Sequence, residues 1–327
     1  MPESPPALDD ATRELLERAA SLDKHAIGRL ISIVEHAGDD TRARRAALFH
    51  HLRAHADVLP DRARILGITG TPGTGKSSLI GRACLDLLRG DERIRIAVLA
   101  IDPTSPRSGG ALLGDRVRTH FPVGERRIFF RSQATRGGLG GVGRRTFAVT
   151  RLLRHLFDLV LIETVGIGQS EIDVTHLSDR TVLVMQPLAG DHVQFMKAGI
   201  MEVPDVFVVN KCDEEALARR SLLELQSALE LATGAGEDGS PRVFQTSART
   251  GLGLEALVAY LAEEAGRPLD PVVRMAQETF FLRKAIAEEY GRFGLEQLDV
   301  VLADRTAPWS YDVAEERCLA ATRARLR

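Results

Sequence analysis

An eight-residue stretch with the pattern GxxxxGK[ST] is the first group of residues that could do chemistry. It reads Gly70-Thr-Pro-Gly-Thr-Gly-Lys-Ser77, between an apolar run and a helical one. Glycines let backbone N–H groups surround a phosphate, and a helix N-terminus favours anions. Lys76 would place a charge on the β- and γ-phosphates, and Ser77 would offer a hydroxyl to Mg²⁺. The pattern predicts a P-loop, whose expected nucleotide contacts are Gly70, Thr71, Gly73, Thr74, Gly75, Lys76, Ser77 and Ser78.

A second polar group, Asn210-Lys211-Cys212-Asp213, follows the apolar run DVFVV and has the NKxD pattern. The Asp213 carboxylate can accept hydrogen bonds from N1–H and the exocyclic amine of guanine, and adenine has no matching pair of donors. Ser247 and Ala248 follow the run RVFQT and suit a loop whose backbone contacts the guanine O6. GTP and GDP are therefore the expected nucleotides, with Mg²⁺ as the metal.

Three further acidic residues lie at or after the ends of apolar runs. Glu163 ends the run FDLVLI, and in Glu163-Thr-Val-Gly166 the glycine would let a backbone N–H approach the γ-phosphate. Asp102 ends IRIAVLAID, and Asp115 lies in the LLGDR stretch after it. Because Mg²⁺ usually keeps waters and one or two carboxylates, Asp102, Asp115 and Glu163 join Ser77 as candidate metal ligands. Helix capping is the alternative role for the two aspartates.

These motifs need elements that bring them together. Six apolar runs alternate with helical stretches from Arg64 onward: ARILGITG, IRIAVLAID, FDLVLIET, RTVLVMQP, DVFVVNK and RVFQTSA. Such runs are typical of buried parallel strands covered by helices on both faces. The expected fold is α/β, with a doubly wound, mostly parallel sheet and helical extensions at both ends. Ligands bind at the carboxyl ends of such strands, where the polar motifs lie.

The two ends of the chain have helical patterns. Ile27, Leu30, Ile31 and Val34 form one apolar stripe at helical spacing. Near the other end, Gly294 is a candidate helix cap, and a final helix is expected from about Val313. We therefore expect an N-terminal helical segment over residues 1–60, a GTPase domain over 61–266 and a C-terminal helical arm over 267–327.

Composition excludes several classes of protein. The 327 residues carry a net charge of −2, which favours neither nucleic acid nor an anionic membrane as a partner. No apolar run is long enough to span a membrane, and the acidic N-terminus does not have the pattern of a secretion signal. Cys84, Cys212 and Cys318 are scattered, which fits a reducing, cytoplasmic setting.

Two further patterns have weaker chemical meaning. His51 and His55 lie one helical turn apart and next to His50, but no third ligand of suitable spacing accompanies them, so solvated helix histidines are the better interpretation. The glycine run at 137–143 does not join a strand to a helix as a nucleotide loop would, and a switch loop is the better interpretation.

Several longer strings occur in a characteristic order: GITGTPGTGKSS, AIDPTSPRSGGALLGDRVR, ATRGGLGGVGR, ETVGIGQSEIDV, AGDHVQFMKAGI and NKCD. From about residue 15 to 265 the chain resembles the MeaB/ArgK-type GTPases, G-protein chaperones associated with methylmalonyl-CoA mutase. The resemblance implies a P-loop GTPase of the dimerising class with a C-terminal dimerisation arm. It also implies a homodimer that protects an adenosylcobalamin-dependent acyl-CoA mutase and gates cofactor loading by GTP hydrolysis.

The same resemblance implies roles for individual residues. Lys76 and Ser77 match the P-loop ligands, and Asp102, Asp115 and Glu163 match the acidic residues around Mg²⁺ and the switch loops. Asp191, Gln194 and Lys197 match a further switch segment that couples the mutase to hydrolysis. The expected catalytic set is Lys76, Asp102, Asp115, Glu163 and Lys197.

This chain departs from the family within that switch segment. The family usually has a GDELQGIKKGI-like string, where this chain has GDHVQFMKAGI after QPLAG. Phe195 replaces a glycine and is larger and stiffer. The hypothesis is that the hydrolytic residues are kept while the partner-reading surface has changed, so that the client mutase could act on another acyl-CoA.

Other functions remain open at this stage. The expected site has no obvious water-positioning glutamine beside Gly166, and Gln169 is a weak candidate, so slow intrinsic turnover and a partner that completes the site are expected. A nickel or cobalt metallochaperone GTPase would ordinarily carry a Cys/His cluster. A transport-linked kinase would ordinarily use ATP, which Asp213 disfavours. A nucleotide-binding scaffold without turnover is the third alternative.

Overall fold

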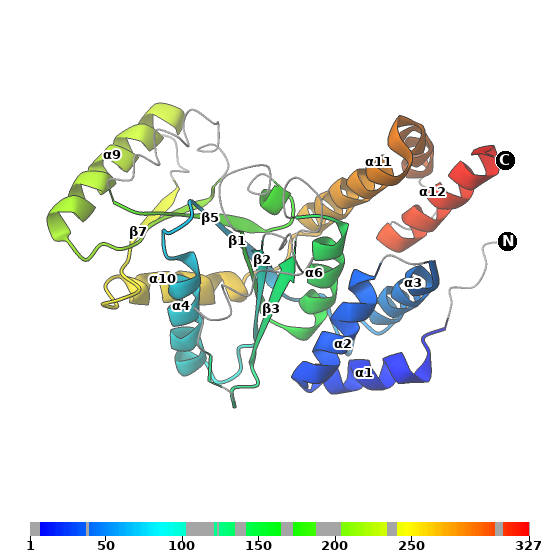
Figure 1. The fold of residues 1–327 in the computed structure, drawn as a ribbon, viewed down its shortest axis with the longest axis horizontal. Helices are drawn as coiled ribbons and strands as arrows, with labels where there is room; N and C mark the ends of the chain where they lie inside the picture. The colour runs from blue at the N-terminus through cyan, green and yellow to red at the C-terminus, as the bar shows by residue number, and fades with distance from the viewer. Residues whose placement is uncertain are drawn as a thin grey trace, which may run out of the picture. The chain divides into compact units, whose positions relative to one another are not determined.

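The computed structural model describes residues 7–36, 39–102, 121–122, 124–134, 142–164, 173–187, 204–233, 241–304 and 310–326. The chain forms two compact units, each described here by itself. The first unit contains residues 1–61, 143–156 and 269–327, and the second contains residues 62–142 and 157–268. The ribbon in Figure 1 follows the elements along the chain.

The second unit is built on a sheet whose described strands are all parallel. They are β1 (Arg64–Thr69), β2 (Ile96–Asp102), β3 (Ile128–Ala134), β4 (Leu159–Glu163), β5 (Arg180–Met185), β6 (Val206–Val209) and β7 (Arg242–Gln245). Their order is β3-β2-β4-β1-β5-β6-β7. In this order β1 lies at the centre, between β4 and β5, so the loop that follows β1 emerges at the middle of the sheet.

Helices cover the sheet on both faces, and the alternation of side chains along the strands shows which helix covers which face. Val182, Val184, Val206 and Val208 belong to the core under α4 (Lys76–Gly90) and α10 (Leu254–Ala265). The intervening residues, Leu183, Met185, Phe207 and Val209, belong to the core under α9 (Glu215–Thr233). Successive side chains of a strand point to opposite faces, so α9 lies opposite α4 and α10. The continuous apolar runs follow from burial on both faces.

The first unit is helical in its described residues. It contains α1 (Asp10–Ala20), α2 (Lys24–Glu35), α3 (Asp39–Ala54), α6 (Arg144–Leu156), α11 (Pro271–Ala303) and α12 (Tyr311–Leu326). The predicted stripe of Ile27, Leu30, Ile31 and Val34 is buried on α2. Helix α6 comes from the middle of the chain, yet it packs on α2 and α11.

Buried ion pairs join α12 to the earlier helices of this unit. The Arg151 guanidinium on α6 donates two hydrogen bonds to Asp312 on α12, at 3.0 and 2.7 Å. It also lies 3.9 Å from the centre of the Phe49 ring, a cation–π contact. Arg45 on α3 lies 3.5 Å from Glu315. Helix α12 is therefore joined to α3 and α6 through buried charges.

Two details differ from the sequence expectations. The predicted cap at Gly294 is wrong, because α11 continues to Ala303; the residue that leaves helical geometry is Gly291, at φ 59° and ψ −148°. Strand β3 was not predicted, because Arg131, Ser132 and Gln133 interrupt its apolar pattern.

Most of the strands agree with the predicted apolar runs. The described strands other than β3 fall within the six predicted runs. The rings of His51 and His55 stack with centres 4.0 Å apart, and no group of three metal-ligating side chains occurs among the described residues. Within those residues, no helix is both long enough and apolar enough to cross a membrane.

Candidate nucleotide site

The loop between β1 and α4 has a backbone that only glycine accommodates well. Gly70, Gly73 and Gly75 have φ values of 139°, 86° and 87°, in the left-handed region. A Cβ on Gly70 would lie 2.0 Å from the Val184 carbonyl oxygen, and one on Gly75 would lie 2.7 Å from Asn210 Nδ2. Helix α4 starts at Lys76, so the loop directs a helix N-terminus toward whatever it encloses.

Lys76 lies inside this loop. Its Nζ donates hydrogen bonds to the carbonyl oxygens of Gly70, at 2.7 Å, and Thr71, at 3.1 Å. The side chain is buried. A cation held by neutral carbonyls within a ring of backbone N–H groups makes an anion-binding concavity. The predicted P-loop residues are thus brought together.

Oxygen ligands gather beside the start of α4. The Ser77 hydroxyl donates to Glu163 Oε1 at 2.7 Å, and both residues are buried. Asp102 closes β2, the neighbour of β4, which Glu163 closes. Asp102 accepts a short hydrogen bond from the hydroxyl of Ser132 on β3. A hydroxyl and carboxylates are the hard oxygen donors that Mg²⁺ prefers, so this donor set fits that ion.

Asn210 joins three loops through a single buried side chain. Its Nδ2 donates to the Thr74 carbonyl oxygen at 2.8 Å. Its Oδ1 accepts hydrogen bonds from Thr246 Oγ1 and the Ala248 backbone N–H, each at 3.2 Å. The P-loop, the end of β6 and the loop after β7 are therefore fixed relative to one another.

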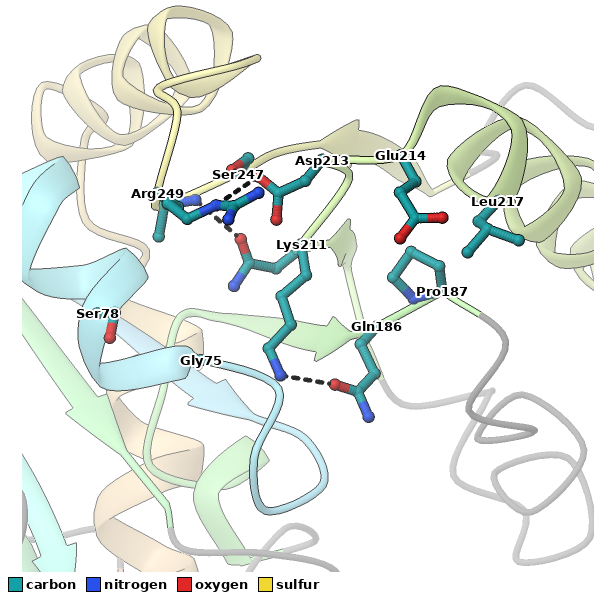
Figure 2. Close-up of a pocket in the computed structure, with 12 residues that line it drawn as sticks. Gly75, Ser78, Gln186, Pro187, Lys211, Asp213, Glu214, Leu217, Ser247 and Arg249 are labelled. Carbon is teal, nitrogen blue, oxygen red and sulfur yellow. Dashed lines mark hydrogen bonds and ion pairs between the residues drawn. The ribbon is translucent and has the colours of Figure 1, made fainter.

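Asp213 faces a cavity of about 740 Å³ (Figure 2). Its Oδ1 accepts a hydrogen bond from the Ser247 hydroxyl at 2.6 Å and lies 3.4 Å from Arg249 Nε. The Ser247 hydrogen bond, aided by the Arg249 charge, holds the pKa of Asp213 below its ordinary value. At neutral pH the carboxylate is ionised and can act only as an acceptor, as recognition of guanine N–H groups requires.

Predicted and unpredicted residues line this cavity together. The predicted ones are Gly75, Ser78, Asn210, Lys211, Asp213, Ser247 and Ala248. The unpredicted ones are Gln186, Pro187, Glu214, Leu217 and Arg249. All five lie within four residues of a predicted motif or directly after β5, so the position of the strand ends was the signal that could have found them. Ser132 had no comparable signal, because β3 was missed.

Several predicted residues lie outside the described part of the chain. They are Asp115, Gly166, Gln169, Asp191, Gln194, Phe195 and Lys197.

A family model described as methylmalonyl Co-A mutase-associated GTPase MeaB matches residues 27–273. The chain belongs to the MeaB family. As a MeaB-family member it is a GTPase, in agreement with the sequence expectation and with a cavity that P-loop and NKCD residues line together.

Individual relatives agree with that placement. The MeaB-family chain is 40% identical over 247 residues to a Pyrococcus horikoshii protein that carries a GTPase name. The aligned region covers 75% of this chain and 74% of the relative. It is 40% identical over 192 residues to the mouse protein named methylmalonic aciduria type A homolog, mitochondrial, which covers 58% of this chain and 46% of the relative.

A solved structure described as LAO/AO transport system kinase has the same fold, with a TM-score of 0.62. The two chains are 23% identical, and the match covers 98% of this chain and 99% of that one. The predicted doubly wound P-loop GTPase fold is thereby confirmed.

Proposed function

We propose that this MeaB-family GTPase is the G-protein chaperone of an adenosylcobalamin-dependent acyl-CoA mutase, which it protects and whose cofactor loading it gates. The observation that carries the proposal is the match of a mutase-associated family over residues 27–273, in a chain whose P-loop and NKCD residues line one cavity. The mouse relative is named for methylmalonic aciduria, which agrees with a client that acts on methylmalonyl-CoA or a related compound.

In this proposal different described residues bind the base, the phosphates and the metal ion. Asp213, with Ser247 and the Ala248 backbone, reads the base, and Lys76 with the P-loop N–H groups neutralises the phosphates. Ser77, Glu163 and Asp102 would hold Mg²⁺, directly or through water. When bound, that ion would supply positive charge that offsets the negative charge of the phosphates.

The roles of the other predicted residues rest on the family resemblance. Asp115 would join the Mg²⁺ shell, and Gly166 would contact the γ-phosphate. Asp191, Gln194 and Lys197 would couple hydrolysis to the mutase. The proposal also includes a homodimer through the C-terminal arm and a cytoplasmic location.

GTP hydrolysis by the full chain, alone and with candidate cobalamin-dependent acyl-CoA mutases, tests this function. We expect a slow basal rate that rises sharply with one mutase, because positioning of the attacking water is left to the partner. A rate that no mutase changes would contradict the chaperone proposal. Tight, stoichiometric nickel or cobalt binding would then favour a metallochaperone, and hydrolysis of ATP as fast as GTP would favour the kinase alternative.

A further inference from the structure

The side chain of Lys211 is unusual because it extends from a backbone whose conformation is constrained. Lys211 has a φ of 64°, which is uncommon for a residue other than glycine. Both neighbours are held in place: Asn210 N–H donates to the Met185 carbonyl at 2.8 Å, and Cys212 N–H donates to the Thr246 carbonyl at 3.0 Å. The direction in which the lysine stem leaves the backbone is therefore set by the sheet.

The far end of the same side chain is held by a different loop. Lys211 Nζ donates a hydrogen bond to Gln186 Oε1 at 2.9 Å, and Gln186 follows directly after β5 (Figure 2). Between these ends the stem passes the P-loop, since a Cβ on Gly75 would lie 3.9 Å from Lys211 Cε. Both Lys211 and Gln186 line the cavity that Asp213 faces.

We propose that Gln186 is a positioning residue for nucleotide binding, which holds the methylene stem of Lys211 extended as an apolar wall for the planar base. A free lysine samples many rotamers and loses that freedom when it packs against a ligand. A stem that is already fixed at both ends binds without that loss, so affinity improves by preorganisation. The inference rests on guanine-nucleotide binding by this site and adds Gln186 to the residues that control it.

Binding of a fluorescent GDP analogue to the full chain, with its dissociation rate measured by chase with excess GDP, tests the inference. We expect Q186A and Q186L to speed dissociation about three- to tenfold, a modest effect because the hydrogen bond is exposed. Q186E keeps an acceptor for the ammonium group and should restore slow dissociation. The matched control is Q226A, which removes an exposed glutamine on α9.

A double-mutant cycle separates positioning of Lys211 from a general effect on the loop. K211M keeps an unbranched apolar stem and removes the ammonium group that Gln186 holds. We expect Q186A to have no further effect in the K211M background, since coupled residues give non-additive changes. An equal effect in both backgrounds would overturn the inference.

Other outcomes are also informative. Unchanged or slower dissociation from Q186A, with wild-type binding intact, would overturn the role of Gln186 and leave the proposed function standing. Absence of GDP binding by the wild-type chain would instead contradict the proposed function.

Discussion

Asp213 and Ser247 lie 34 positions apart in the chain, yet a hydrogen bond joins them at the lining of one cavity. The serine hydroxyl orients the carboxylate and lowers its pKa, so that the carboxylate faces the cavity as an ionised acceptor. Both residues follow strands, and the parallel order of β6 and β7 brings them together. The sequence motifs placed both residues after strands, but the hydrogen bond between them was not predicted.

We expect D213N to weaken GTP binding about a hundredfold or more, because the amide offers a donor where the guanine N–H groups need an acceptor. Xanthosine triphosphate, which has a carbonyl in place of the exocyclic amine, should lose less affinity or gain some. Affinity for the two nucleotides, measured by competition, checks the prediction. Equal losses for both would indicate a collapsed loop rather than altered base recognition.

Ser132 provides a test of the proposed Mg²⁺ site. Its hydroxyl donates to the buried Asp102 carboxylate, so S132A removes a donor without touching the P-loop. We expect kcat to fall about tenfold, which corresponds to about 1.4 kcal/mol, with a higher Mg²⁺ requirement and little change in GDP affinity. Hydrolysis measured over a series of Mg²⁺ concentrations checks this. S132T keeps the hydroxyl and should retain most activity; an equally inactive S132T would point to packing instead.

At the scale of elements, the loop between β1 and α4 shows the difference between backbone strain and steric overlap. Gly70 and Gly73 both have positive φ, but only Gly70 approaches another backbone, at Val184. A side chain at Gly73 would meet nothing within 4 Å. The motif marks both glycines equally, so sequence alone could not rank them.

We therefore expect G70A to abolish nucleotide binding and lower the free energy of unfolding by about 3 kcal/mol or more. G73A should lower it by about 1–2 kcal/mol, since only the left-handed backbone is penalised. G90A is the control, because Gly90 lies in α4 with open space around its Cα and alanine favours a helix. Denaturant unfolding of the three variants gives the order, and equal losses for G70A and G73A would contradict it.

The attachment of α12 depends on buried charge. Burial alone would raise the pKa of Asp312, but the Arg151 guanidinium outweighs burial and holds that pKa below its ordinary value. A lowered pKa in the folded state means that this stabilisation is present above about pH 4 and is lost as the pH falls through the folded-state pKa.

We expect D312N to lower the free energy of unfolding by about 3–5 kcal/mol at pH 7, because Arg151 is left buried without its partner carboxylate. The difference from the wild type should shrink as the pH falls below about 4. Thermal unfolding of both chains between pH 3 and pH 7 checks this. A difference that stays constant with pH would show that packing, not charge, holds α12.

At the scale of the whole molecule, units and sequence segments do not coincide. The expected division at residues 60 and 266 follows the chain, whereas residues 143–156, which contain α6, belong with the helices from both ends. The sequence motifs, the apolar runs and the helical patterns near both ends of the chain made the fold predictable. The position of α6 was not predictable, because its amphipathic pattern does not say which surface it covers. The contacts of Ser132 and Gln186 were not predicted for a related reason, since they depend on the order of the strands in the sheet.

We predict that a fragment of residues 61–266 will fold poorly although it contains the whole P-loop and the NKCD motif. It would keep α6 but lack α2 and α11, on which α6 packs, so Phe147 and Leu152 would lose their covering. Increased binding of a hydrophobic dye and concentration-dependent association on a sizing column should separate the fragment from the full chain. A monomeric fragment with normal GDP affinity would contradict the prediction.

The ion pairs between distant segments of the helical unit also impose an order on biosynthesis. Arg42 leaves the ribosome before its partner Glu289, which follows 247 residues later. At ordinary rates of translation that interval is roughly 10–50 s. The strands of the second unit are synthesised during it, while the arginines of α3 have no acidic partner from α11 or α12. The helical unit is therefore completed by residues 269–327 only after the strands of the second unit have been translated.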